Sequence, residues 1–186
     1  SVREGLPLVG TEDFTLAFED NNGVKLEFDP GKNNPLIVNK VTPLDADSGK
    51  TVVTLSLVTE EFIRNEEGNA SIRVRMDGKI SDHVSEILTD FLKTEKALDI
   101  EDTSNNYNFV GNNRKPYYIL NWLSKFGVPS GAEESDATAG FFFFETSEGF
   151  KFKSIDGLFG QEAKKKFVFN ATADTGGVVP PGYDGK

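Results

Sequence analysis

Hydrophobic and polar residues alternate through most of the first 76 positions of the chain, which is the pattern of strands with one buried face. Apolar side chains recur at every second residue, or cluster, in five segments: 14–18, 24–28, 36–41, 53–59 and 72–76. Turn-forming or polar residues lie between them, at 20–23, 29–31, 45–50 and 65–69. Sequential antiparallel strands at this spacing predict a small β-barrel or a strongly curved sheet.

The period changes after Gly78, where apolar residues recur at helical spacing. One helical face is formed by Val84, Ile87, Leu88, Phe91 and Leu92. Ser81 is placed to cap this helix at its N-terminus. After a polar connection at 103–115, Pro116 suits the first position of a second helix, because its missing N–H group needs no partner there. The apolar stripe of the second helix is Ile119, Trp122, Leu123 and Phe126. Gly127 is expected to end it.

Four consecutive phenylalanines at 141–144 predict a β-strand, since aromatic residues favour strands and the run is too short for a helix. The turn at 147–149 leads to a returning strand with Phe150 and Phe152, which completes a hairpin. Successive strand residues point to opposite faces, so both faces of the phenylalanine strand require cover. We expect a helix or second sheet on one face and a partner chain or domain on the other.

The segments around this hairpin are less regular. Residues 130–139 are small and acidic, which predicts a loop, and Lys166–Asn170 predicts one further short strand. Residues 173–186 are rich in glycine and proline, and we expect no packed structure there.

Charge and composition restrict the possible functions. The chain has 186 residues, 30 of them acidic and 20 basic, and a formal net charge of −10. Stable binding to nucleic acid is not expected, because such binding depends largely on clustered lysine and arginine. No run of 18 apolar residues occurs, so we expect no membrane binding by this chain. The lack of cysteine and the single histidine, His83, exclude thiol chemistry and multi-histidine metal sites, and no cofactor or metal is predicted.

Candidate catalytic groups are weak. His83 lies near the start of the first helix with no nucleophile in its sequence context, and we interpret it as a surface histidine. Residues 45–49 have acidic residues at the alternate positions of a calcium loop, but the glycine is misplaced and position 56 is serine instead of glutamate. Paired carboxylates at 60–61, 66–67 and 133–134 leave one enzymatic alternative, a small cell-wall glycosidase or other carbohydrate-active domain. Against it, Trp122 is the only tryptophan available to bind a sugar ring. We therefore predict no catalytic residues.

Several motifs occur in a fixed order between residues 78 and 160. They are Gly-Lys-Ile-Ser-Asp at 78–82 before the first helix, Asn-Arg-Lys-Pro-Tyr at 113–117 before the second, Gly-Phe-Phe-Phe-Phe-Glu-Thr at 140–146, Glu-Gly-Phe-Lys-Phe at 148–152, and Ser-Ile-Asp at 154–156 followed by Leu158. Upstream, Leu-Val-Gly-Thr-Glu at 8–12 and Val-Thr-Glu-Glu at 58–61 complete the series. Together these motifs, over about residues 8–160, resemble the baseplate hub proteins of contractile-tailed bacteriophages. In that family an arginine-proline turn precedes a helix that packs under an aromatic hairpin.

The resemblance implies a structural role without catalysis. Hub proteins of this kind form trimeric rings in which each subunit has two barrel-like domains, and the ring joins the tail tube to a central spike. The expected partners are therefore further copies of this chain, tail tube proteins and the spike or tail-lysozyme protein. The expected location is the virion tail baseplate, assembled in the bacterial host cytoplasm. A negatively charged surface would suit a channel through which DNA passes without adhering.

The resemblance also implies the division of the chain. We expect an α+β fold with a barrel-like tube domain at 1–80, a helical segment at 81–130, and a hairpin region at 131–172 that belongs to a second barrel-like domain. Because family members have chain beyond these regions, we expect the sequence to be part of a longer protein. The candidate packing or interface residues are Phe141, Phe142, Phe143, Phe144, Phe150, Phe152 and Trp122.

Overall fold

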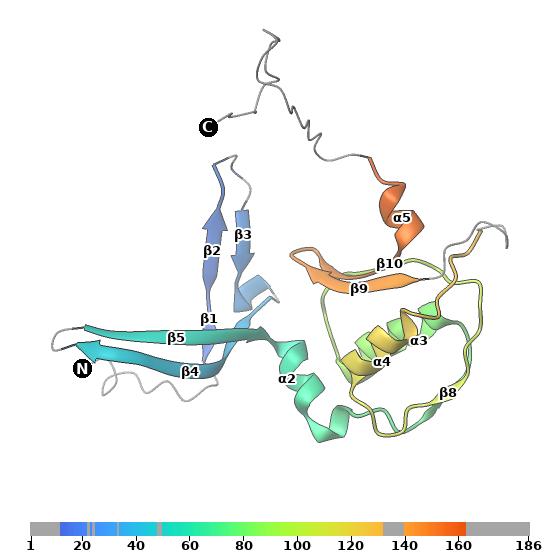
Figure 1. The fold of residues 1–186 in the computed structure, drawn as a ribbon, viewed down its shortest axis with the longest axis horizontal. Coiled ribbons are helices and arrows are strands. Elements are labelled where there is room, and N and C mark those ends of the chain that lie inside the picture. The colour runs from blue at the N-terminus through green and yellow to red at the C-terminus, as the bar shows by residue number, and fades with distance from the viewer. Residues whose placement is uncertain are drawn as a thin grey trace, which may run out of the picture.

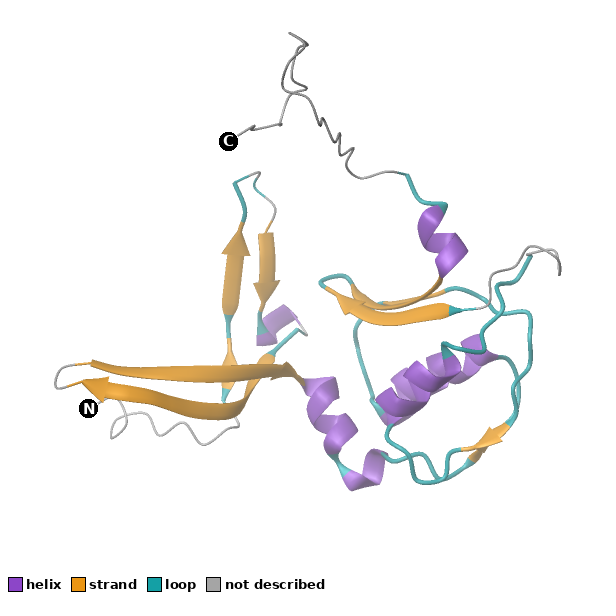
Figure 2. Cartoon of the chain, viewed as in Figure 1, coloured by secondary structure: helices purple, strands orange, loops and turns teal. Residues whose placement is uncertain are grey.

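The computed structural model describes residues 12–21, 23, 25–32, 34–47, 50–131 and 140–162. The predicted α+β class is confirmed. The chain has two visibly different regions, which we call the arm (residues 12–59, all strands and turns) and the body (residues 60–162, with all of the described α-helices) (Figures 1 and 2).

The arm contains two antiparallel sheets. One has strands β1 (Asp13–Phe14), β4 (Leu36–Asp47) and β5 (Lys50–Thr59) in the order β1-β4-β5. The other is a hairpin of β2 (Leu16–Glu19) and β3 (Lys25–Phe28), followed by the 3-10 turn η1 (Pro30–Lys32). The long β4–β5 hairpin extends away from the body (Figure 1). Among the described strands none of the sheets closes, so the small-barrel form of the prediction is not observed and the open antiparallel form is.

The body mixes helices with a sheet of a different kind. Its helical elements are α2 (Glu60–Glu66), the 3-10 turn η2 (Gly68–Ala70), α3 (Ile80–Glu86), the π-helical segment η3 (Ile87–Phe91), α4 (Pro116–Leu123) and α5 (Ile155–Phe159). Its strands are β6 (Arg75–Met76), β7 (Leu98–Ile100), β8 (Phe109–Val110), β9 (Phe141–Thr146) and β10 (Gly149–Ser154). In the main sheet, of order β7-β10-β9, β10 runs antiparallel to β9 and parallel to β7, while β6 and β8 form a separate short pair.

One hydrophobic core holds the body together. It draws on the two predicted helices and on the hairpin, and its fully or nearly buried members are Ile72, Met76, Ile80, Val84, Ile87, Leu88, Leu92, Ile119, Leu120, Leu123, Phe141, Phe150 and Phe152. Phe141 stacks on Phe152 with ring centroids 4.6 Å apart, and Phe143 on Phe150 at 5.7 Å. This core therefore joins the helical segment to the hairpin, although the sequence analysis assigned the two to different domains.

Gly149 allows the hairpin to lie close to the segment before β7. Its φ of +130° is one that residues with a Cβ rarely adopt, and a Cβ there would overlap the Ala97 carbonyl oxygen. The next residue, Phe150, donates its N–H to that same carbonyl at 2.9 Å. Glycine thus lets the hairpin approach the chain just before β7 closely enough for the two strands to pair.

The structure corrects several local predictions. The predicted turn at 65–69 begins inside a helix, α2, that the hydrophobic pattern did not indicate. The segment 72–76 contributes only the two-residue strand β6 and a bridge from Ile72 to Arg114. Ser81 is not the N-cap of the first helix, because α3 begins at Ile80 and Lys79 is its N-cap residue. The second helix ends at Leu123 rather than near Phe126.

His83 is the clearest correction to a single residue. It is 2% exposed instead of lying at the surface. The polar connection at 103–115 wraps over the start of α3, so that the His83 Nε2 atom lies 2.9 Å from the Tyr107 carbonyl oxygen and the imidazole meets the Phe109 ring edge-on at 5.4 Å. Since a carbonyl only accepts hydrogen bonds, Nε2 carries the proton. The histidine therefore holds this loop against α3 through one hydrogen bond and one aromatic contact.

Some predictions fall outside the described residues. These are the loop at 132–139, the strand at Lys166–Asn170, the segment 173–186, the carboxylate pair at 133–134 and the motif at 8–11. The side chains of the loop at 45–49, which was compared with a calcium loop, lie outside them as well.

Candidate functional site

Helix α2 connects the arm to the body through its polar side chains. Glu61, Arg64 and Asn65 occupy positions i, i+3 and i+4 and so lie on one face of the helix. Each of the three bonds to a different part of the rest of the body, and we call these polar contacts of α2 the joint.

Glu61 enters a buried ion-pair cluster with Lys96. The Lys96 ammonium lies 2.8 Å from Glu61 Oε2 and 2.6 Å from Glu145 Oε1 on β9, and the Thr94 hydroxyl donates to Glu61 Oε1 at 2.6 Å. Burial alone would raise the pKa of Glu61, but hydrogen bonds from Lys96 and Thr94 outweigh it and hold the pKa below its ordinary value. The cluster has two carboxylates and one ammonium, which leaves a net charge of −1.

Arg64 and Asn65 bond to the ends of two helices in the body. The Arg64 guanidinium donates to the carbonyl oxygens of Leu92 (2.9 Å) and Lys93 (2.5 Å), just beyond the π-helical segment, where carbonyl groups lack helical partners. Asn65 Oδ1 accepts the backbone N–H of Tyr117 at 2.8 Å, within the first turn of α4. Asn65 therefore supplies from α2 the cap that the side chain of Lys115, the local N-cap residue, does not provide.

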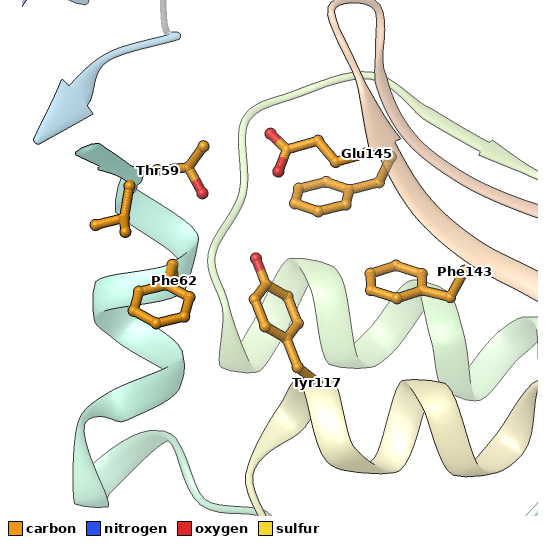
Figure 3. Close-up of a pocket in the computed structure, with 7 residues that line it drawn as sticks. Thr59, Phe62, Tyr117, Phe143 and Glu145 are labelled. Atoms are coloured by element: carbon orange, nitrogen blue, oxygen red, sulfur yellow. The ribbon is translucent and has the colours of Figure 1, made fainter. Parts of the chain in front are cut away.

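A pocket of about 260 Å³ opens between α2 and the aromatic hairpin. It is lined by Val58, Thr59, Phe62, Tyr117, Phe143, Glu145 and Phe150. The Tyr117 ring lies between Phe62 and Phe143, and its hydroxyl points towards the side of the pocket where Thr59 and Glu145 are found (Figure 3). Burial raises the pKa of Tyr117, with the nearby charges of Glu145 and Glu61 adding to the effect, so the phenol is neutral. The lining is aromatic on its walls and polar at one side.

The predicted interface residues separate into two groups. Phe141, Phe150 and Phe152 are buried in the core, and Phe143 is half-buried in the pocket wall. On the opposite face of β9, Phe142 is 53% exposed and Phe144 is half-buried. The alternation along the phenylalanine strand is as predicted, and within the described residues its second face lacks full cover.

Trp122, a candidate packing or interface residue, packs away from this hairpin. It is half-buried in a separate aromatic cluster, where its ring centroid lies 5.3 Å from both Tyr107 and Phe109 and 5.4 Å from Phe126. Phe126 also stacks on Tyr107 at 5.0 Å. The cluster packs the loop at 103–115 against α4.

A second polar cluster of the body surrounds Asp102. Asp102 accepts hydrogen bonds from the Ser130 hydroxyl (2.8 Å), the Lys79 ammonium (3.2 Å) and the Ser81 hydroxyl (3.1 Å). These donors, Ser130 first, lower the pKa of Asp102, which makes it a poor base for activating Ser81. Among the described residues no three His, Asp or Glu side chains are arranged to hold a metal ion.

The carboxylate pairs proposed for sugar cleavage are occupied in other ways. Glu61 pairs with Lys96, and Glu60 pairs with Arg64. Glu66 pairs with Lys115, and this ion pair lowers the pKa of Glu66. A general acid for glycoside cleavage needs a raised pKa instead.

Comparisons with known proteins do not assign the chain to a family. No protein-family description, no curated protein and no solved structure matches it. The longest helices in the described part of the chain are too short, and not apolar enough, to cross a lipid bilayer.

The hairpin half of the pocket was predictable from the sequence, whereas the rest was not. Phe143 and Phe150 were identified by their aromatic pattern. Thr59, Phe62 and Tyr117 belong to two other segments, and only the tertiary fold brings them to the hairpin. A usable signal existed in the polar residues of α2, which recur at helical spacing although its apolar residues do not.

Proposed function

We propose that this chain is a structural component of a phage tail baseplate hub, an adaptor between the tail tube and the central spike, with no catalysis of its own. The observation that carries the proposal is the packing of the motif-bearing segments. The helix that Pro116 opens lies against the aromatic hairpin, with Tyr117 and Phe143 rings 5.9 Å apart and Gly127 so close to Phe141 that a Cβ would lie 2.5 Å from its ring. This is the arrangement that the resemblance to hub proteins implies.

Exposed apolar surface supports an assembly role in a second way. Phe142 on the hairpin and Phe18 on the arm are each more than half exposed, and the sheets of the arm are open at their edges among the described strands. Open edges and apolar faces are features that proteins usually cover with a partner.

The arm gives the proposal less support than the body does. A hub tube domain implies a barrel-like sheet over residues 14–76 with the two helices packed against it. Instead α3 and α4 pack against the main sheet of the body. The strand predicted at 72–76 contributes β6, which pairs with β8 of the body and not with the arm. This counts against a tube domain formed by the described strands alone. The hub role therefore rests on residues 78–158.

The wider assignment follows from the same resemblance. We place the chain in the virion tail baseplate as part of a homotrimer, in contact with tail tube proteins and a spike or tail-lysozyme protein. Its assembly would take place in the host cytoplasm, without stable binding to nucleic acid.

Immunogold labelling of purified contractile-tailed particles that encode this chain tests the proposal. Antibodies raised against the chain should label the end of the tail distant from the capsid. Absence of the chain from purified particles, or label on the capsid, would contradict it. A parallel assay addresses the enzymatic alternative, since release of reducing sugar from cell walls that depends on Glu61 or Glu145 would favour a glycosidase.

A further inference from the structure

The pocket between α2 and the hairpin contains a charge that its own neighbours do not balance. Among the described residues, Glu145 is the only charged one in the lining, and its side chain is 27% exposed. Its ion-pair partner Lys96 is shared with Glu61, which is almost completely buried. One ammonium between two carboxylates leaves the pocket with an excess negative charge.

The remaining lining matches a particular kind of cation. Four of the pocket's seven lining residues are aromatic: Phe62, Tyr117, Phe143 and Phe150. Aromatic faces attract cations, and a planar guanidinium can stack on them while donating several hydrogen bonds. The polar side of the pocket offers acceptors at the Glu145 carboxylate and at the hydroxyl oxygens of Thr59 and Tyr117 (Figure 3). A guanidinium has five N–H donors and no acceptor, so it complements this set.

We propose that this pocket binds an arginine side chain presented by a partner protein. The charge excess selects a cation, the aromatic walls favour guanidinium over ammonium, and the volume of about 260 Å³ accommodates one side chain rather than a folded element. The inference does not depend on the hub role, because it concerns the chemistry of this pocket in any assembly.

The test is an NMR titration of the full chain with two short peptides. The probe is acetyl-Gly-Arg-Gly-amide, and its matched control carries citrulline, a neutral residue of nearly the same shape, in place of arginine. The arginine peptide should shift the signals of Phe62, Tyr117 and Phe143 in a saturable way, and the citrulline peptide should bind at least about tenfold more weakly. Equal binding of both peptides, binding elsewhere or no binding would overturn the proposal.

Two variants test whether the Glu145 carboxylate is responsible for the preference for arginine. Glu145→Gln should reduce the preference for arginine over citrulline about tenfold or more, whereas Glu148→Gln, three residues along the same hairpin and outside the pocket, should leave it unchanged. Near-ultraviolet circular dichroism checks that both variants keep the native fold. Retention of the arginine preference in a folded Glu145→Gln variant would overturn the proposal. A further variant, Phe143→Leu, should weaken arginine binding several-fold while keeping the wall apolar.

The chain also has cations of its own that could compete for the pocket, among them the three lysines at 164–166. If the unaltered chain resists the arginine peptide but the combined variant Lys164→Gln, Lys165→Gln, Lys166→Gln binds it, the pocket serves this segment of the chain. That result would overturn the assignment to a partner protein.

Discussion

The arm and the body both contain strands with alternating apolar residues, but only the body buries most of them. Among the described residues of the arm, Leu36 and Val38 are the only buried hydrophobic side chains, and Phe18 is 55% exposed. In the body, Phe150 and Phe152 of β10 are almost completely buried because α3 and α4 cover that face of the sheet. An alternating pattern therefore predicts a strand, and the elements packed on it decide whether the pattern forms a core.

The joint between the two regions follows a different rule. Helix α2 bonds to the rest of the body through the Glu61 carboxylate, the Arg64 guanidinium and the Asn65 amide. Each of them forms a hydrogen bond with a specific group there. Such contacts depend on geometry more than on area, because a buried polar group left without its partner is costly. The following changes separate the contributions of the arm, the joint and the body, in order of decreasing effect.

Removal of an aromatic ring should give the largest difference in the free energy of unfolding between a change in the body and a change in the arm. Phe152→Ala in the body should lower the free energy of unfolding by about 3–5 kcal/mol, since it deletes a fully buried ring that stacks on Phe141. Phe18→Ala in the arm should change it by less than about 0.5 kcal/mol. Urea unfolding followed by circular dichroism measures both. Equal effects would show that the arm has a core comparable to that of the body.

Removal of the shared ammonium tests the joint. Lys96→Met should cost about 3 kcal/mol, because it leaves the Glu61 and Glu145 carboxylates without their cation. The matched change Lys25→Met breaks an exposed pair with Glu19 in the arm and should cost less than about 1 kcal/mol. Chemical denaturation at neutral pH compares them. A Lys96→Met variant as stable as the original chain would mean that the cluster contributes nothing net.

Loss of the cap supplied from α2 is expected to have a smaller effect. Asn65→Ala removes the acceptor for the Tyr117 N–H at the start of α4, for an expected cost of about 1–2 kcal/mol. Asn121→Ala, at an exposed position on the same helix, should stay within about 0.5 kcal/mol. Hydrogen exchange at the first turn of α4 provides a local measurement. Unchanged protection there in Asn65→Ala would contradict the capping role.

The smallest expected effect is on the pH dependence of stability. The folded-state pKa of Glu61 is lower than its ordinary value of 4.5, so its carboxylate contributes stability that is present above pH 4.5 and is lost as the pH falls through the folded-state pKa. Thermal unfolding between pH 7 and pH 3 should therefore show a shallower decline for Glu61→Gln than for the original chain. Glu67→Gln, at an exposed position just after α2, should reproduce the original slope. Identical slopes for all three proteins would mean that Glu61 has the same pKa in the folded and unfolded chain.

Periodicity predicted the elements that have a continuous apolar face. The face of the first helix, from Val84 to Leu92, is buried except for Phe91, which is half-buried, and Pro116 begins the second helix as expected. The aromatic hairpin likewise forms in the predicted segments, although Gly149 belongs to the returning strand and not to the turn. In each case the signal is local, because neighbouring residues along the element share the same environment.

The features that sequence reasoning missed depend on partners far along the chain. Helix α2 has no apolar stripe that the pattern could reveal, since its buried positions are Glu61 and Asn65. His83 is buried by a loop that begins some twenty residues later, a distance that no local pattern encodes. The pocket combines residues of β5, α2, α4 and the hairpin, and only its hairpin residues stood out.

The parallel pairing of β7 with β10 also determines the order in which the body can form. Strand β10 lies near the end of the described chain, yet its phenylalanines complete the core under α3 and α4. During synthesis both helices therefore leave the ribosome before β9 and β10 exist. The nascent chain must keep the apolar faces of these helices from aggregating until residue 154 has emerged, so the body folds late and as a single unit.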